Sequence, residues 1–346
     1  MCRRTFPPDA WAGASGFADG DVNNLEVHAE VQEALQAGTP VVALESAVIT
    51  TGVPREPLHR PPPFDAPQWD ANEPTNLQLA RTLPRLVRDA GAIPATVGII
   101  DGVLRVGLDD DQLLRLAVEP ETAKASVGDM SYMMSAGKTA GTTVSSTLFA
   151  CERTQPAAIR VMATGGIGGL HRGWQAHLDI SADLTQLARS PVCVVCSGIK
   201  SILDVRATLE ALEALGVPVI AYGADRFPLF YTQGQRDIPP PRRLDHVTDI
   251  VQLCRTQWTT LGLLRGVVVA NPVPAEFALE PEEVERIVCA IEAEPDHPAS
   301  FGRDRTPDLL QAVAQQTGGR GLDANLALLA ENARLAARIA VELVLG

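Results

Sequence analysis

Lysine is the scarcest charged residue type in this chain. Of the 29 basic residues, 26 are Arg and only three are Lys, namely Lys124, Lys138 and Lys200. Arg does not deprotonate in proteins, whereas burial can neutralise a Lys and make it a nucleophilic amine. Because Arg supplies the other positive charges, each lysine is either a candidate for chemistry that a guanidinium cannot perform or an ordinary surface residue.

Lys200 and Glu45 stand in contexts that favour catalysis. Lys200 ends an apolar run and precedes a predicted helix. That position belongs to the carboxyl edge of a parallel sheet, where a Lys can form a Schiff base with a carbonyl substrate; the alternative is a salt bridge to Asp204 on the same helix. Glu45 interrupts the apolar run 41–49. Burial there would raise its pKa and suit it to general acid catalysis; the alternative is a solvent-facing acid.

A polar cluster follows a glycine-rich stretch. The stretch Thr164–Gly169 follows a predicted strand but does not match GxGxxG, because His171 occupies the third glycine position. We interpret it as a loop that lets a ligand approach the backbone. His171, His177, Asp179 and Asp183 come next, and mostly oxygen ligands favour Mg²⁺ or Mn²⁺ over Zn²⁺. The alternative is a polar loop with capping aspartates.

Composition excludes several classes of protein. A formal net charge of −13 disfavours binding to DNA or structured RNA. No run of 18 apolar residues is present, which predicts no membrane span, and the N-terminus has no apolar signal-peptide core. The six cysteines are scattered, which predicts a reducing cytoplasm. Cys193 and Cys196 form a CxxC within a strand, where they point to opposite faces and are expected to be core residues.

Apolar strand-like runs alternate with helical periodicity along the chain. This pattern predicts an α/β fold, a three-layer α/β/α arrangement with a largely parallel central sheet, in a single large domain at 25–346 after an irregular arm at 1–24. A Pro-rich stretch at 55–75 excludes helix and central strand and predicts a long loop, either a functional lid or binding loop or a disordered insertion. We expect strands at 41–49, 95–100, 104–106, 158–163, 191–196, 217–222 and 266–270, and helices at 25–36, 77–90, 109–117, 142–151, 201–215, 247–261, 282–294, 306–316 and 322–345.

Together these segments resemble the pseudouridine-5′-phosphate glycosidase family, from about residue 27 to the C-terminus. The matching stretches are ALES at 43–46, GAIPAT at 91–96, IIDG at 99–102, GTTV at 141–144, ATGGIGG at 163–169, HRG at 171–173, DISADL at 179–184, SGIKSILD at 197–204 and VANP at 269–272. So many motifs in one order make the resemblance specific.

The resemblance implies a homotrimer, a divalent metal (Mn²⁺ or Mg²⁺) and chemistry at C1′ of ribose 5-phosphate. By position, Lys200 matches a Schiff-base nucleophile, Glu45 a proton donor and Asp179 a metal ligand acting through waters. The remaining matched positions are His171 and Asn271 in the active site and Lys124, Thr143, Val144, Ser181, Ala182 and Asp183 around the phosphate and ribose. A carbon–carbon glycosidic bond has no leaving heteroatom to protonate, so two carboxylates alone do not suffice to cleave it. An iminium at C1′ provides the electron sink, and Glu45 handles the proton at the aglycone carbon.

The departures from the family lie near the acid. TGVP at 51–54 replaces a His-Gly-Met-Pro-like stretch, SVGD at 126–129 replaces Ser-Arg-Arg-Asp, and residues 55–75 are inserted. This pattern predicts a C-glycosynthase that joins ribose 5-phosphate to an aromatic aglycone, as in aromatic polyketide antibiotic pathways. The alternative is a pseudouridine-5′-phosphate glycosidase that releases uracil. Weaker alternatives are a Schiff-base phosphosugar aldolase and a non-enzymatic sugar-phosphate sensor.

The inserted loop carries two aromatic side chains, Phe64 and Trp69. Its many prolines make it stiff, and it leaves the strand that holds Glu45. We therefore expect it to line or cover the aglycone pocket, of this subunit or of a neighbouring one, and to offer flat surfaces for stacking.

Overall fold

The central strands are the most apolar segments of the chain. In the computed structural model, which describes residues 24–292 and 312–345, every residue of the strands VVAL, CVVC and VVVA at 41–44, 193–196 and 267–270 is buried. Strands buried on both faces are typical of parallel sheets covered by helices. The strands are β1 Leu25–Val27, β2 Val41–Leu44, β3 Ile93–Ile100, β4 Val103–Val106, β5 Ala123–Ala125, β6 Ala140–Thr142, β7 Val161–Ala163, β8 Cys193–Cys196, β9 Val219–Tyr222, β10 Arg243–Leu244 and β11 Val267–Ala270.

The strands form one sheet in the order β1-β4-β3-β2-β7-β8-β11-β9-β10. From β3 to β10 all neighbours on this path are parallel, whereas β4 and the short β6 run antiparallel to β3. The expectation of a largely parallel α/β sheet is confirmed. Because β2, β7, β8 and β11 are parallel neighbours, the residues that follow their carboxyl ends meet at one edge of the sheet.

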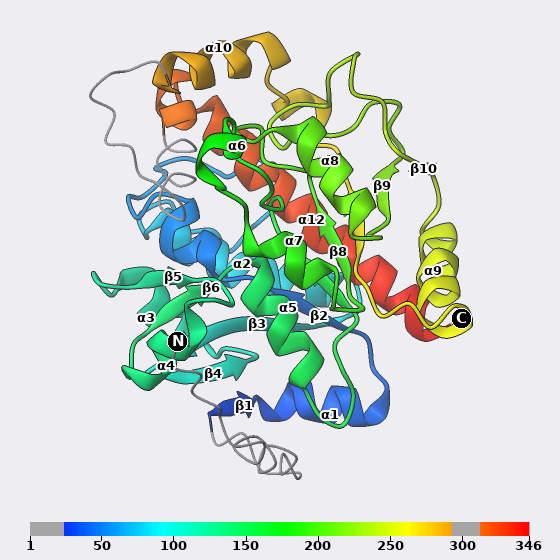
Figure 1. Cartoon of the computed structure of the whole chain (residues 1–346). Helices are drawn as coiled ribbons and strands as arrows, with labels where there is room; N and C mark the ends of the chain where they lie inside the picture. Colours follow the sequence, from blue (N-terminus) through cyan, green and yellow to red (C-terminus); the bar gives the residue numbers. More distant parts are fainter. Residues whose placement is uncertain (1–23, 293–311, 346) are drawn as a thin grey trace, which may run out of the picture.

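Helices cover the sheet on both sides (Figure 1). The long α12 packs along β2, β7 and β8 and beside α2 and α9, while α5 and α7 pack together in front of the sheet in this view. None of the described helices is long and apolar enough to cross a membrane. The helices are α1 Ala29–Ala37, α2 Thr75–Asp89, α3 Asp110–Val118, α4 Met130–Ser135, α5 Val144–Arg153, α6 Trp174–His177, α7 Ala182–Leu187, α8 Val205–Ala214, α9 Val247–Arg255, α10 Pro281–Glu292 and α12 Arg320–Leu345, with π-turns η1 Val48–Gly52 and η2 Thr256–Thr260 and a 3₁₀ turn η3 Ala275–Phe277.

Four of the predicted elements differ from the structure. The first three residues of the helix expected at 25–36 form β1, because they pair with β4. The strand expected at 41–49 ends at Leu44, so that η1 begins three residues beyond Glu45. The helix expected at 201–215 begins only at Val205, because the Asp204 side chain caps its N-terminus, and the helix expected at 247–261 passes into η2 after Arg255. The arm at 1–23 and the first part of the helix expected at 306–316 lie outside the described residues.

Candidate active site

The carboxyl ends of the parallel strands surround a cavity of about 390 Å³. Ten of the eleven site residues predicted from the sequence line it, from segments that are far apart in the chain. These ten are Glu45, Lys124, Thr143, Val144, His171, Asp179, Ser181, Ala182, Asp183 and Lys200.

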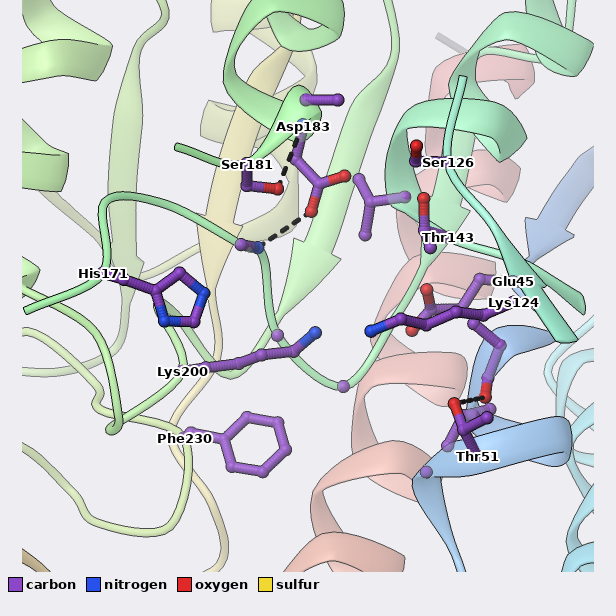
Figure 2. A pocket seen from close by; sticks show the side chains of 18 of the residues that line it. Glu45, Thr51, Lys124, Ser126, Thr143, His171, Ser181, Asp183, Lys200 and Phe230 are labelled. Carbon is purple, nitrogen blue, oxygen red and sulfur yellow. Dashed lines mark hydrogen bonds between the residues drawn. The ribbon is translucent and has the colours of Figure 1, made fainter. Parts of the chain in front are cut away.

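Two lysines face each other inside the cavity. Figure 2 shows the amines of Lys200 and Lys124 pointing toward one another, with Glu45 beside them. Ser126, Thr143, Ser181 and Asp183 lie on one side of this group, here called the polar side, and Thr51 and Phe230 lie on the other, here called the apolar side. The third lysine, Lys138, instead lies 5.6 Å from the centre of the Tyr132 ring and does not line the cavity. Two of the three lysines of this chain therefore belong to one site.

Glu45 stands directly after β2 with its carboxyl group inside the cavity. Burial raises the pKa of this carboxyl above its ordinary value, although the positive charge of Lys200 and a hydrogen bond from Thr164 act in the opposite direction. The Thr164 hydroxyl, at the end of β7, donates that bond to Oε1 over 2.5 Å. A carboxyl group with a raised pKa retains its proton at higher pH, as a general acid requires.

Lys200 lies in the turn between β8 and α8. Its backbone N–H donates to the carbonyl of Ile167 over 3.3 Å, which joins this turn to the glycine-rich loop. Asp204 caps α8 by accepting a hydrogen bond from the Ala207 N–H over 3.0 Å, so Asp204 serves the helix that begins after Lys200. The sequence alternative of a Lys200–Asp204 pair within one helix is therefore wrong, because Lys200 precedes the helix.

The carboxylate of Asp183 holds three segments of the polar side together. It accepts one hydrogen bond from the Ser145 N–H at the start of α5 and one from the Gly168 N–H of the glycine-rich loop, both over 2.9 Å. Its own backbone N–H donates to the Ser181 hydroxyl, which caps α7. The N-terminus of α5, where Thr143 and Val144 line the cavity, thus already binds one anionic group, the Asp183 carboxylate.

The glycine-rich loop is explained by close packing as well as by access to the cavity. A Cβ at Gly166 would lie 2.6 Å from the Phe230 ring, and a Cβ at Gly168 would overlap the Ser181 hydroxyl. Gly165, Gly166 and Gly168 also line the cavity, as the sequence predicts for a loop that a ligand approaches. The glycines therefore let two side chains and a ligand all approach the same backbone.

Asp179 and His171 lie side by side in the lining of the cavity. The backbone N–H of His171 donates to the backbone carbonyl of Asp179 over 3.0 Å. In the side chains, His171 Nδ1 lies 3.9 Å from Asp179 Oδ2. No group of three or more His, Cys, Asp or Glu is placed to hold a metal among residues 24–292 and 312–345. His177 is exposed and does not line the cavity, and Asp183 is engaged by backbone N–H groups. The residues present therefore fit a hard cation held by one carboxylate and waters, but not a cage of protein ligands.

Asn271 does not line the cavity, which corrects the sequence prediction. It follows β11, and its side-chain amide donates to Asn332 Oδ1 over 3.1 Å. Asn332, from α12, donates in turn to the Thr164 carbonyl and the Ser197 hydroxyl. Asn271 therefore supports the loops that carry the site from behind, because its side chain points toward α12.

Sequence reasoning missed two lining residues of the apolar side. Asn325 is a polar residue on the apolar helix α12, and its amide donates to the Gly52 carbonyl over 3.2 Å. Phe230 has φ +55° although it is not glycine, a conformation that costs of order 1–3 kcal/mol and persists only where the surroundings impose it. The sequence feature that could have indicated Asn325 as a site residue is its polar side chain within the apolar stripe of a helix.

The inserted loop packs on its own chain and does not line the cavity. Phe64 and Trp69 contact each other edge to face and pack against the core. Arg60 pairs with Asp323 over 2.6 Å, and Arg55 donates to the Glu119 carbonyl over 3.0 Å. No residue of 55–75 is among those that line the cavity. The expectation that the loop lines the cavity of its own subunit is therefore wrong, because its aromatic side chains complete the core.

An α/β sheet with a lysine and a buried carboxyl group in a cavity at its carboxyl edge defines an enzyme active site. Residues 70–342 match the family described as "Indigoidine synthase A like protein", and the chain belongs to this family. It is 40% identical to a pseudouridine-5′-phosphate glycosidase of Glaesserella parasuis over 92% of this chain and 98% of the relative, and 43% identical to one of Myxococcus xanthus over the same shares.

Two solved structures share the fold. One is the prealnumycin C-glycosynthase AlnA in complex with ribulose 5-phosphate, with a TM-score of 0.78, 34% identity and coverage of 92% of this chain and 97% of that chain. The other is an indigoidine synthase A-like protein from Thermotoga maritima, with a TM-score of 0.77, 33% identity and coverage of 92% and 96%. The chain is accordingly an enzyme that cleaves or forms a glycosidic bond.

Proposed function

We propose that the chain cleaves pseudouridine 5′-phosphate reversibly into uracil and ribose 5-phosphate. The observation that carries the proposal is the meeting of the Lys200 amine and the Glu45 carboxyl, whose pKa burial raises, in one cavity. The names of the relatives at 40–43% identity support uracil as the aglycone.

The chemistry follows from the two side chains. The Lys200 amine bonds to C1′ as the C1′–O4′ bond breaks, and O4′ leaves with the electron pair and takes up the proton that the lysine nitrogen then loses. Glu45 then delivers a proton to the aglycone carbon. The electron pair of the carbon–carbon bond returns to the aglycone ring while the lysine nitrogen forms C1′=N. Water hydrolyses this iminium, releases ribose 5-phosphate as its aldehyde and restores the lysine.

The polar side of the cavity suits the sugar phosphate. Lys124 offers positive charge, and Thr143 and Ser181 offer hydroxyls. We propose that Asp179 holds Mn²⁺ or Mg²⁺ through waters, with His171 beside it. When bound, that cation supplies positive charge for the phosphate and sugar oxygens.

The apolar side suits a flat ring with a polar edge. Ala47, Val48 and Phe230 give it apolar surface, and Asn325 adds an amide whose hydrogen bond to Gly52 uses only its N–H₂ group. An amide offers one acceptor and donors side by side, which complements the alternating carbonyls and N–H of a uracil edge.

A C-glycosynthase acting on another aromatic aglycone is the second candidate. AlnA, at 34% identity, favours it. Thr51 favours it as well, because it stands in the cavity lining where the family has a His-Gly-Met-Pro-like stretch, and its hydroxyl is engaged within its own turn by donating to the Ala47 carbonyl over 3.1 Å. Two of the sequence arguments for this candidate lose support, because Val127, Gly128 and the inserted loop do not line the cavity.

One assay separates the candidates. The enzyme is incubated with Mn²⁺ and pseudouridine 5′-phosphate, and in parallel with ribose 5-phosphate plus uracil or plus electron-rich aromatic acceptors, and products are separated by chromatography. Release of uracil and ribose 5-phosphate supports the proposal. Coupling to the aromatic acceptors without release of uracil favours the C-glycosynthase. Turnover of ribose 5-phosphate only when a carbonyl donor is added in a further incubation indicates an aldolase, and binding of ribose 5-phosphate in calorimetry with no turnover in any incubation indicates a sensor. The homotrimer stays a prediction, which light scattering checks.

A further inference from the structure

Phe230 occupies a backbone position that ordinarily belongs to glycine. It and Tyr231 form the tip of a tight turn closed by two hydrogen bonds between the backbones of Leu229 and Thr232, each 3.2 Å long. Of the two central residues of this turn only the first, Phe230, has a positive φ, of +55°. In turns of this kind glycine is the usual residue at the first central position. A bulky aromatic side chain at such a position is an outlier that points to a function for the ring.

The surroundings leave the ring no room to move. The Phe230 N–H donates to the Ser197 carbonyl over 2.8 Å, three residues before Lys200. The ring rests on the backbone at Gly166, where even a methyl group would collide with it. It is 2% exposed, and the part that remains accessible lines the cavity on the side of Lys200 away from Asp183 and Ser181. The ring is therefore a rigid end wall of the apolar side.

We propose that Phe230 is a specificity-determining residue that sets how deeply a planar aglycone enters the cavity. Sugar hydroxyls and phosphate gain nothing from an apolar ring, whereas a flat aglycone packs well against one. Because the glycine backbone behind the ring prevents its retreat, the size of residue 230 fixes the length of the apolar side. The proposal rests on the proposed function, since it assumes that the aglycone occupies this side.

The test measures aglycone binding with the sugar side already filled. The protein is saturated with ribose 5-phosphate and reduced with borohydride, which converts the imine into a stable adduct. Calorimetry then compares the affinities for uracil and for dihydroxynaphthalene, a larger flat ring. The variants are Phe230→Gly, which suits the backbone conformation, and Phe230→Leu. The matched control is Phe227→Leu, a fully buried aromatic residue of the same loop that does not line the cavity.

We expect Phe230→Gly to shift the affinity ratio by about tenfold toward the larger ring, with a smaller shift in the same direction for Phe230→Leu. The control should leave the ratio within about twofold, while lowering the melting temperature through lost packing. An unchanged ratio in both Phe230 variants, or an equal change in the control, overturns the proposal. Absence of any adduct at Lys200 by peptide mass mapping overturns the proposed function instead, and the same ratio measured on unreduced protein then decides the role of Phe230.

Discussion

The hydrogen bond between Thr164 and Glu45 offers a direct test of the acid. Thr164 is 2% exposed, and its hydroxyl donates to Oε1 of Glu45 over 2.5 Å. This bond stabilises the carboxylate form and so lowers the pKa of Glu45 against the larger, opposite effect of burial. Thr164→Val keeps the shape of the side chain and removes the donor. The pKa of Glu45 should therefore rise further in the variant.

The size of the effect follows from the energy of the bond. A hydrogen bond to a charged group contributes about 1.5–3 kcal/mol, and a tenfold change in a proton equilibrium corresponds to about 1.4 kcal/mol. If protonated Glu45 is the acid for cleavage, activity is lost as the pH rises through its pKa. The alkaline limb of kcat/KM against pH should then move upward by about one pH unit or more in Thr164→Val.

The assay is the pH dependence of uracil release from pseudouridine 5′-phosphate. Thr82→Val is the matched control, because the Thr82 hydroxyl is also buried and bonds to the Gln78 carbonyl on α2, away from the cavity. Its pH profile should coincide with that of the wild type. An alkaline limb that stays in place in Thr164→Val, or moves downward, refutes the assignment of Glu45 as the acid.

Because the folded-state pKa of Glu45 is raised, its contribution to stability is present at low pH and lost as the pH rises through that pKa; the variant should show this loss at higher pH than the wild type.

Three further predictions concern the lysine, the metal and the inserted loop. Lys200→Arg should form no borohydride-trapped adduct with ribose 5-phosphate and should be inactive, because a guanidinium forms no imine; an adduct at Lys138 in the wild type would contradict this. Chelation should abolish activity and Mn²⁺ should restore it, and Asp179→Ala should weaken Mn²⁺ binding measured by calorimetry, whereas full activity of metal-free enzyme removes the idea. Deletion of 57–73 should lower the melting temperature, because it removes Phe64 and Trp69 from the core, yet leave adduct formation at Lys200 unchanged; a loss of aglycone use by the assembled protein would instead place the loop at a neighbouring subunit's cavity.

The fold class and most of the site could be predicted from the order of the amino acids. Apolar runs such as VVAL and CVVC are long enough only for buried strands, and their alternation with helical periodicity indicates a parallel α/β sheet. In such a sheet the residues that follow the strands gather at one edge, so the sequence pattern places Lys200 at that edge. Glu45 was expected within the strand at 41–49, and only the resemblance to the family joined it to Lys200. The scarcity of lysine pointed to three residues, of which Lys124 and Lys200 lie in the cavity and Lys138 does not.

The boundaries of the elements depended on contacts that sequence periodicity does not contain. Residues 25–27 continue the pattern of α1 but form a strand, because the edge of β4 offers backbone hydrogen bonds. The strand before Glu45 ends at Leu44, and η1, which begins at Val48, is held by distant groups such as the Asn76 amide, which donates to the carbonyl of Ile49.

The residues that face the apolar side of the cavity were settled by tertiary packing alone. The prolines and aromatic residues of 55–75 are typical both of a binding loop and of a loop that completes a core, and the choice depends on what Phe64 and Trp69 find within reach. Asn325 and Phe230 lie 280 and 185 residues from Glu45 in the sequence and join it only through the packing of α12 and of one strained turn. Local sequence patterns carry no information on such contacts, because these depend on the simultaneous placement of segments that fold together.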